Sequence, residues 1–221
     1  MGENGRRLES LGERVRVQAC SLGLKLRSEE ISLMEQHFAL LQRWNPAVGL
    51  TAARDPAGAA PLYLEALQIV DWMQAPPAGR LLDLGSGGGF PGMVLAILKP
   101  AWSVTLMDRA ARKVAFLQEA ARTLGLRNLH VLELDLKRPE DLPPGLEPDL
   151  LTSKAVGQFT LTLDLLERRA SDDGRAILLT GERGEMAIRR EIERRNGRLR
   201  LQERRLISGK NRAFALMVQK V

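Results

Sequence analysis

The sequence contains few of the residues that form covalent or metal-bound frameworks. Cys20 is the only cysteine among the 221 residues, so an internal disulfide and a cysteine-based zinc site are both excluded. The two histidines, His37 and His130, stand far apart in the chain, and a metal site built from histidines is therefore not expected. Both histidines are expected to be structural, and the protein is expected to work without a metal ion.

Long apolar runs are also missing, and aromatic residues are scarce. No run of about eighteen apolar residues occurs, so the sequence predicts no membrane span. No apolar block follows the arginines at positions 6 and 7, and no secretory signal is expected. Aromatic residues make up 4% of the chain, too few for extensive stacking on nucleic-acid bases. We expect a cytoplasmic protein that acts as a monomer.

Positive charge is in excess, and it is concentrated near the C-terminus. The chain has 33 basic and 27 acidic residues, a net charge of +6. Nine arginines and four glutamates lie within residues 183–205, so this window alone carries +5. One interpretation is a solvated helix with pairs such as Glu185–Arg189 and Glu191–Arg195 at a spacing of four residues. The other, compatible with it, is a surface that faces RNA phosphates. The expected RNA-binding residues are Arg189, Arg190, Arg194 and Arg195.

Residues 1–79 are predicted to form a helical extension that packs on the main domain. Residues 1–20 show no convincing apolar stripe and are expected to be a frayed helix or a tail. A helix is predicted from Ser28, where apolar residues recur at spacings of three and four, and Asn45-Pro46 should end it. A second apolar helix is predicted over residues 61–73, before a proline-rich break.

Residues 80–221 alternate between predicted strands and helices. This order is typical of a doubly wound, mostly parallel, Rossmann-like α/β sheet. A turn at Ser208-Gly209-Lys210-Asn211 predicts a closing hairpin that adds an antiparallel strand. The expected strands are residues 80–84, 103–107, 129–134, 149–153, 175–180, 202–207 and 213–219. The expected helices are residues 92–98, 109–124, 159–169 and 185–195.

A glycine-rich segment follows the first predicted strand and carries most of the chemical information. Five glycines lie within residues 85–92, where a strand should turn into a helix. Glycine allows a ligand to approach the backbone closely, and ligands of open parallel sheets bind at the carboxyl ends of the strands. The alternative is a tight structural turn. Asp83 stands just upstream, where it is expected to brace the loop.

Two further acidic residues favour a ligand that contains a nucleoside. Asp108 ends the second predicted strand, where a carboxylate can accept hydrogen bonds from both ribose hydroxyls. The alternative for Asp108 is a helix N-cap. Phe90-Pro91-Gly92 stands where a phosphate-binding loop would need a lysine, which argues against ATP. The closing hairpin, together with Asp135 at the end of the third strand, fits S-adenosylmethionine better than a dinucleotide.

Three segments of the chain together resemble one known family. Residues 45–55 read Asn-Pro-Ala-Val-Gly-Leu-Thr-Ala-Ala-Arg-Asp, residues 83–92 hold the glycine loop with Phe-Pro-Gly, and residues 153–155 read Ser-Lys-Ala. The combination, over Gln36 to the C-terminus, resembles ribosomal small-subunit methyltransferase G, formerly called glucose-inhibited division protein B. The resemblance implies a class I methyltransferase fold. It also implies transfer of a methyl group from S-adenosylmethionine to N7 of one guanine in 16S ribosomal RNA of the small subunit.

The resemblance also places family site residues on this chain. Gly85 and Phe90 would line the cofactor, although Phe90 is equally consistent with a core residue. Asp108 would hold the ribose, and Leu136-Lys137 would lie on the adenine side. The full expected cofactor-binding set is Asp83, Gly85, Gly87, Gly89, Phe90, Asp108, Asp135, Leu136, Lys137 and Lys154.

The chain departs from the family pattern at three places on the substrate side. Lys154 replaces the arginine of Ser-Arg-Ala and loses its planar fork. Asp135-Leu136-Lys137 stands where the family has Arg-Ala-Glu. Residues 61–66 replace Arg-His-x-x-Asp-Ser, so that the histidine is lost and Glu65 stands at the aspartate position. These differences put the RNA target in more question than the fold or the cofactor.

Methylation of guanine N7 needs no general base, because N7 carries a lone pair and no proton. The protein has only to position and desolvate the two reactants, so no residue is assigned as the catalyst. Lys154 and Glu65 are the candidates, against the alternatives of a solvated strand-end lysine and a solvent-facing helix residue. Two other functions stay open: a methyltransferase for another RNA site or a small molecule, and a non-catalytic RNA-binding relative.

Overall fold

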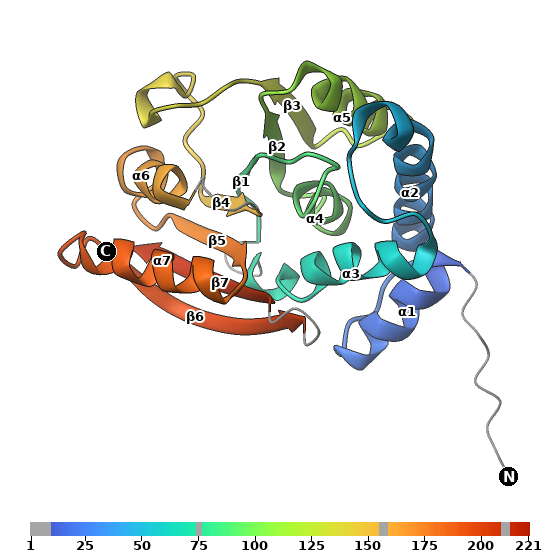
Figure 1. Ribbon diagram of the computed structural model, residues 1–221, viewed down its shortest axis with the longest axis horizontal. Helices are drawn as coiled ribbons and strands as arrows, with labels where there is room; N and C mark the ends of the chain where they lie inside the picture. Colours follow the sequence, from blue (N-terminus) through green and yellow to red (C-terminus); the bar gives the residue numbers. More distant parts are fainter. Residues whose placement is uncertain (1–9, 74–76, 155–158, 209–212) are drawn as a thin grey trace, which may run out of the picture.

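The computed structural model describes residues 10–73, 77–154, 159–208 and 213–221. These residues form one seven-stranded sheet in the order β3-β2-β1-β4-β5-β7-β6, with helices on both faces (Figure 1). The predicted doubly wound, mostly parallel sheet is confirmed. The strands are β1 Arg80–Leu84, β2 Ser103–Asp108, β3 Leu129–Glu133, β4 Leu150–Ser153, β5 Arg175–Thr180, β6 Leu199–Ser208 and β7 Ala213–Lys220.

The helices cover both faces of the sheet. Alternate residues of a strand point to opposite faces, so each strand contributes side chains to both apolar cores. Leu81 of β1 belongs to the apolar core on one face, with residues of the five helices from α1 to α5. Leu82 belongs to the core on the other face, beneath α6 and α7. In Figure 1, α2 and α5 lie to the right of the sheet and α6 to the left. The helices are α1 Leu11–Ser21, α2 Ser28–Val48, α3 Pro56–Leu67, α4 Gly92–Leu98, α5 Ala111–Thr123, α6 Phe159–Arg169 and α7 Glu182–Glu193, with short 3-10 turns η1 Val70–Met73 and η2 Pro139–Asp141.

The parallel register brings the ends of three central strands together. Strands β1, β2, β3, β4 and β5 run parallel, and Leu84 at the end of β1 is paired with Met107 of β2 and Ser153 of β4. The loops that leave β1, β2 and β4 therefore start from one edge of the sheet. The closing pair β6–β7 is antiparallel, as predicted, although residues 209–211 of its predicted turn lie outside the described residues.

Two expectations for the N-terminal helices are wrong. Residues 11–21 form a regular helix rather than a frayed segment, because Ser10 and Glu13 form a capping box and Leu11, Val15 and Ala19 are buried. The apolar stripe of this helix was not recognised in the sequence, because its third residue, Ala19, is a small alanine.

Pro46 does not end α2, which continues to Val48 and stops at Gly49 with a left-handed φ of 70°. The Asn45 side chain accepts hydrogen bonds from the amides of Leu50 and Thr51 and donates one to the Thr51 carbonyl. These three bonds offset the unfavourable helical conformation of a residue that precedes proline.

Other element boundaries shift by a few residues. The second predicted helix begins earlier, at Pro56, because Asp55 caps it by accepting a hydrogen bond from the Gly58 amide. The arginine-rich helix α7 begins at Glu182 rather than Glu185. Among the described residues, no helix has both the length and the apolar character to cross a membrane.

Candidate active site

The glycine loop between β1 and α4 depends on left-handed backbone. Gly85, Gly87 and Gly89 have φ values of 72°, 54° and 89°, a region that side chains rarely tolerate. A Cβ atom on Gly89 would also lie 2.9 Å from the Met93 Cβ and 3.2 Å from the His37 Nε2. The loop therefore folds tightly over its neighbours while its backbone stays accessible to a ligand.

Asp83, in β1, stabilises the glycine loop through hydrogen bonds of its buried carboxylate. Its carboxylate accepts hydrogen bonds from the Thr152 hydroxyl at 2.6 Å and from the Gly92 amide at 3.3 Å. The side chain is completely buried, and burial raises the pKa of Asp83 to about 6. Asp83 thus ties the end of β1 to β4 and to the start of α4.

Asp108, at the end of β2, meets the same loop from the side. One oxygen accepts a hydrogen bond from the Gly87 amide at 2.9 Å, and the other accepts one from the Ala110 amide at 3.0 Å. Ala110, not Asp108, is the N-cap of α5, so the N-cap alternative is wrong. A carboxylate has about four acceptor positions, which leaves Asp108 able to accept further hydrogen bonds.

Two cavities flank the loop and share Gly85 in their walls. The first, which we name the Asp108 cavity, has a volume of about 190 Å³. The second, the Lys154 cavity, has a volume of about 170 Å³. The Asp108 cavity is lined by Leu84, Gly85, Met107, Asp108, Arg109, Lys113, Leu134, Asp135, Leu136 and Leu161. The Lys154 cavity is lined by Leu50, Thr51, Leu62, Gly85, Ser86, Gly87, Gly88, Phe90 and Lys154.

The segment after β3 presents only part of its predicted site to the Asp108 cavity. Asp135 and Leu136 line the cavity. Lys137 is absent from the lining, and its ammonium lies 2.7 Å from the Asp135 carboxylate. The lysine at the family's glutamate position is therefore paired beside the cavity rather than placed inside it.

The two catalytic candidates form an ion pair with each other. Lys154 follows β4 and Glu65 lies on α3, and their charged groups are in contact. The side chains are 28% and 15% exposed, so the solvated alternatives for both residues are wrong. Ser153, next to Lys154, is completely buried, and its hydroxyl has no hydrogen-bond partner among the described residues. Ala155 of the family motif lies outside those residues.

His37 connects the helical extension to the glycine loop, a contact that the sequence did not reveal. Its Nε2 lies 3.0 Å from the Gly88 carbonyl and its Nδ1 lies 3.0 Å from the Tyr63 hydroxyl. A carbonyl only accepts, so Nε2 carries the proton and Nδ1 accepts from Tyr63. Burial lowers the pKa of His37 to about 4, and the ring is neutral. His37 is structural, as predicted.

Phe90 is a core residue, which is one of its two predicted alternatives. Its ring packs edge-on against Tyr63, with 5.0 Å between ring centroids, and lies 5.3 Å from His37. It is buried in the core and also forms a wall of the Lys154 cavity.

The predicted RNA-binding arginines are not equivalent. Arg195 is only 7% exposed, and its guanidinium pairs with Asp164 and Glu167 at 2.8 Å and with Glu191 at 3.0 Å. Its expected role at an RNA-facing surface is therefore wrong, because a buried guanidinium whose two terminal nitrogens pair with carboxylates cannot reach a phosphate. Arg189 pairs with Glu185 at 2.9 Å, as its spacing predicts. Arg190 and Arg194 are exposed.

The fold and the loop define a class. A seven-stranded sheet with a closing antiparallel pair, a glycine loop after β1 and an acidic residue ending β2 is the arrangement of class I methyltransferases. A solved structure of an S-adenosylmethionine-dependent methyltransferase from Aquifex aeolicus shares this fold, with a TM-score of 0.54, 20% identity, and coverage of 65% of this chain and 82% of that one.

Sequence comparison identifies the family within this class. The family profile described as rRNA small subunit methyltransferase G matches residues 30–208. Ribosomal RNA small subunit methyltransferase G of Bordetella petrii is 35% identical over 171 residues, which cover 75% of this chain and 66% of that protein. Ribosomal RNA small subunit methyltransferase G of Acidovorax sp. strain JS42 is 44% identical over 128 residues, which cover 52% of this chain and 57% of that protein. The chain belongs to the rRNA small subunit methyltransferase G family.

Proposed function

We propose that this protein transfers a methyl group from S-adenosylmethionine to N7 of a guanine in 16S ribosomal RNA. The observation that carries the proposal is the pair of cavities that meet at Gly85, one beside a carboxylate with free acceptor positions and the other beside the Lys154–Glu65 pair. A two-part cavity of this kind suits a nucleoside on one side and the transferred group on the other. Membership of the family supports the choice of acceptor.

The residues of the Asp108 cavity fit the nucleoside half of S-adenosylmethionine. Asp108 would accept hydrogen bonds from the ribose hydroxyls. Leu134, Leu136 and Leu161 offer apolar walls to the adenine ring, and the Asp135 carboxylate can accept from its amino group. Gly85 and Gly87 would let the cofactor lie against the loop backbone, with Gly89 and Asp83 holding that loop in shape. Lys137 would contribute its backbone alone, because its side chain is paired with Asp135.

The Lys154 cavity fits the reacting end. When bound, S-adenosylmethionine supplies an electrophilic methyl group on a positively charged sulfur. Phe90, Leu50 and Leu62 offer apolar surface that excludes water from this end. An unpaired lysine would repel the sulfonium, and Glu65 offsets that charge. The ammonium keeps donors that Glu65 does not use, and these can reach guanine O6.

The reaction requires the protein mainly to position the guanine and the methyl donor. The N7 lone pair forms the new bond to the methyl carbon as the sulfur–carbon bond breaks, and the positive charge moves from sulfur to the purine ring. No proton leaves N7, so no base is required. Holding the guanine at O6 by Lys154 would aim N7 at the methyl carbon, and orientation of this kind accounts for a large part of such rate accelerations.

Two measurements test the proposal. Titration calorimetry should show S-adenosylmethionine binding to the purified protein. Labelled methyl groups should then pass from the cofactor to the RNA of small ribosomal subunits that lack the family's modification, and not to large subunits. Cofactor binding without label in 16S RNA would redirect the function to another RNA or a small molecule. Absence of cofactor binding would favour a non-catalytic RNA-binding protein.

A further inference from the structure

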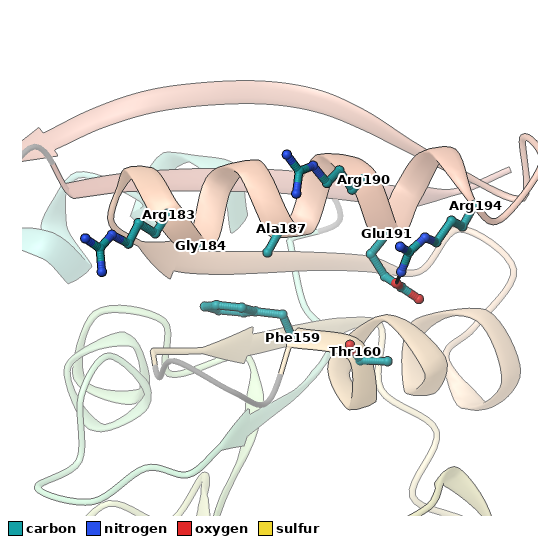
Figure 2. A pocket seen from close by; sticks show the side chains of 8 residues that line it. All are labelled: Phe159, Thr160, Arg183, Gly184, Ala187, Arg190, Glu191 and Arg194. Atoms are coloured by element: carbon teal, nitrogen blue, oxygen red, sulfur yellow. Dashed lines mark ion pairs between the residues drawn. The ribbon is translucent and has the colours of Figure 1, made fainter.

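A groove of about 480 Å³ lies between α6 and α7 (Figure 2). None of its lining residues lines either cavity of the candidate active site. Arg183 and Arg190 of α7 and Arg194, its C-cap, line one side of it, and Phe159 and Thr160 at the start of α6 form the opposite wall (Figure 2). Its lining residues are Phe159, Thr160, Arg183, Gly184, Ala187, Arg190, Glu191 and Arg194.

The arginines that line the groove face the same side of α7 and its C-cap, and carboxylates neutralise them only in part. Arg183, Arg190 and Arg194 are separated by seven and four residues, or about 10 Å and about 6 Å along a helix. In the part of the chain that the structure describes, no carboxylate lies within ion-pairing distance of Arg183 or Arg190. Arg194 approaches only Glu191, at 3.5 Å, and its side chain is 76% exposed. Three arginines against one glutamate leave a local charge of +2.

The floor of the groove is apolar, and a glycine in it allows α7 to pack closely against β5 and the start of α6. A Cβ atom on Gly184 would lie 1.8 Å from the Thr180 hydroxyl and 3.1 Å from the Phe159 ring. Ala187 continues the floor with a single methyl group. The result is a narrow apolar channel with guanidinium groups along one rim. This chemistry matches a sugar–phosphate backbone, because guanidinium groups bind phosphates in a bidentate fashion.

One end of the groove opens at the edge of the sheet that carries Lys154. Strands β4 and β5 are parallel neighbours, with Ser153 paired to Leu178. Helices α6 and α7 follow these strands, so Phe159 and Arg183 both lie at the carboxyl end of the sheet. Arg194 lies at the far end of α7. A strand bound in the groove would thus run toward the Lys154 cavity.

We propose that the α6–α7 groove binds the phosphate backbone of the RNA through Arg183, Arg190 and Arg194. The inference rests on the proposed function, since it supplies the path by which the RNA reaches the Lys154 cavity. Arg183 was outside the set expected from the sequence, whereas Arg189 and Arg195 do not line the groove and each pairs with carboxylates.

The test is the salt dependence of binding to protein-free 16S RNA, measured without cofactor. Each phosphate contact contributes about 0.7–0.9 to the slope of the logarithm of affinity against the logarithm of salt concentration. The triple variant R183A/R190A/R194A should therefore lower the slope by about 2. A variant with lysine at the same three positions keeps the charges and should retain most of the slope.

The matched control, R43A/R122A/R127A, removes three exposed arginines with the same change in net charge; they lie on α2, on α5 and in the loop between α5 and β3. The proposal predicts a much smaller change for this control. An unchanged slope in the groove variant, or an equal loss of slope in both alanine triple variants, would overturn the proposal. An unchanged slope would indicate that the groove binds an acidic protein segment instead of RNA. Methyl transfer by the wild-type protein is scored separately. If the wild type transfers no methyl group while the groove variant alone loses slope, the proposed function fails and the groove assignment stands.

Discussion

Lys154 and Glu65 form an ion pair between the residue that follows β4 and the last turn of α3. These are two of the positions where the sequence departs from the pattern of the family it resembles, lysine for arginine and glutamate for aspartate. In the folded protein the two departures meet. A basic and an acidic side chain still face each other, with the ammonium in the wall of the Lys154 cavity. The two sequence differences are therefore compatible with each other, because they place one basic and one acidic side chain in contact.

The Lys154–Glu65 pair should affect stability and activity differently. Glu65→Gln leaves a partly buried ammonium without its partner, and unfolding free energy should fall by about 1–3 kcal/mol, less than for a fully buried pair. The double variant K154M/E65L removes both charges and should regain most of that stability in urea denaturation. It should stay inactive in methyl transfer, because no donor remains for guanine O6. Full activity of the double variant would show that the pair is only structural.

His37 and Asp83 should give opposite pH dependences of stability. The pKa of His37 is lowered to about 4, so its contribution to stability is complete above its ordinary pKa of 6.5 and is lost as the pH falls toward 4. The pKa of Asp83 is raised from 3.8 to about 6, so folding is favoured as the pH falls through 6 toward 3.8. Each effect is worth up to about 3 kcal/mol, and the two nearly cancel between pH 4 and 6.

Single variants separate these two effects. From pH 7 to pH 4, the unfolding free energy of D83N relative to wild type should fall, by up to about 3 kcal/mol. That of H37Q should rise by a similar amount, since the glutamine does not titrate. Urea denaturation at several pH values measures both. Parallel pH profiles for the two variants and the wild type would contradict the burial of these ionisable groups.

Asp108 should contribute directly to cofactor affinity. Asp108→Ala removes the proposed ribose acceptor and the acceptor of the Gly87 amide, and S-adenosylmethionine should bind about 5- to 150-fold more weakly, which corresponds to about 1–3 kcal/mol. Calorimetric titration measures this directly. Lys137→Ala serves as the control, because that side chain lies outside the cavity and its loss should change affinity little. Normal binding by the Asp108 variant would remove the ribose assignment.

Arg195 and Arg190 should differ in what their loss affects. Arg195→Met deprives three carboxylates of a shared partner, and unfolding free energy should drop by about 2–3 kcal/mol after allowance for their partial exposure. Arg190→Met removes an exposed side chain and should change stability by less than about 0.5 kcal/mol. Chemical denaturation of both variants checks the contrast. Equal stabilities would contradict the buried position of Arg195.

The sheet could be predicted from sequence because its signals are local. Short apolar runs alternate with amphipathic segments, and the glycines at 85, 87 and 89 mark the turn after β1. The predicted helix boundaries differ from the observed ones where a side-chain hydrogen bond overrides the backbone preference. The Asn45 side chain stabilises the continuation of α2 beyond Pro46, and the Asp55 cap makes α3 begin earlier than predicted. Both effects come from side-chain hydrogen bonds, three at Asn45 and one at Asp55, which a periodicity argument does not include.

The candidate site was only partly predictable, because its remaining contacts join segments distant in sequence. Asp83 lies near the end of β1 and Asp108 ends β2, so both could be placed at the carboxyl ends of the strands in advance. The contacts of Lys154 with Glu65, and of His37 with Gly88, depend on how the N-terminal helices pack. Arg195 failed as an RNA-binding candidate for the same reason, since the carboxylates of α6 that bury it lie about thirty residues away in the chain.

The central claim concerns the atom that receives the methyl group, and nucleoside analysis tests it most directly. Small ribosomal subunits lacking the family's modification would be incubated with the protein and labelled S-adenosylmethionine, and their 16S RNA digested to nucleosides. The account predicts that the label co-elutes with 7-methylguanosine and that K154M/E65L yields none. Label on another position or base, at a stoichiometric level, would contradict the geometry proposed for Lys154 and guanine O6.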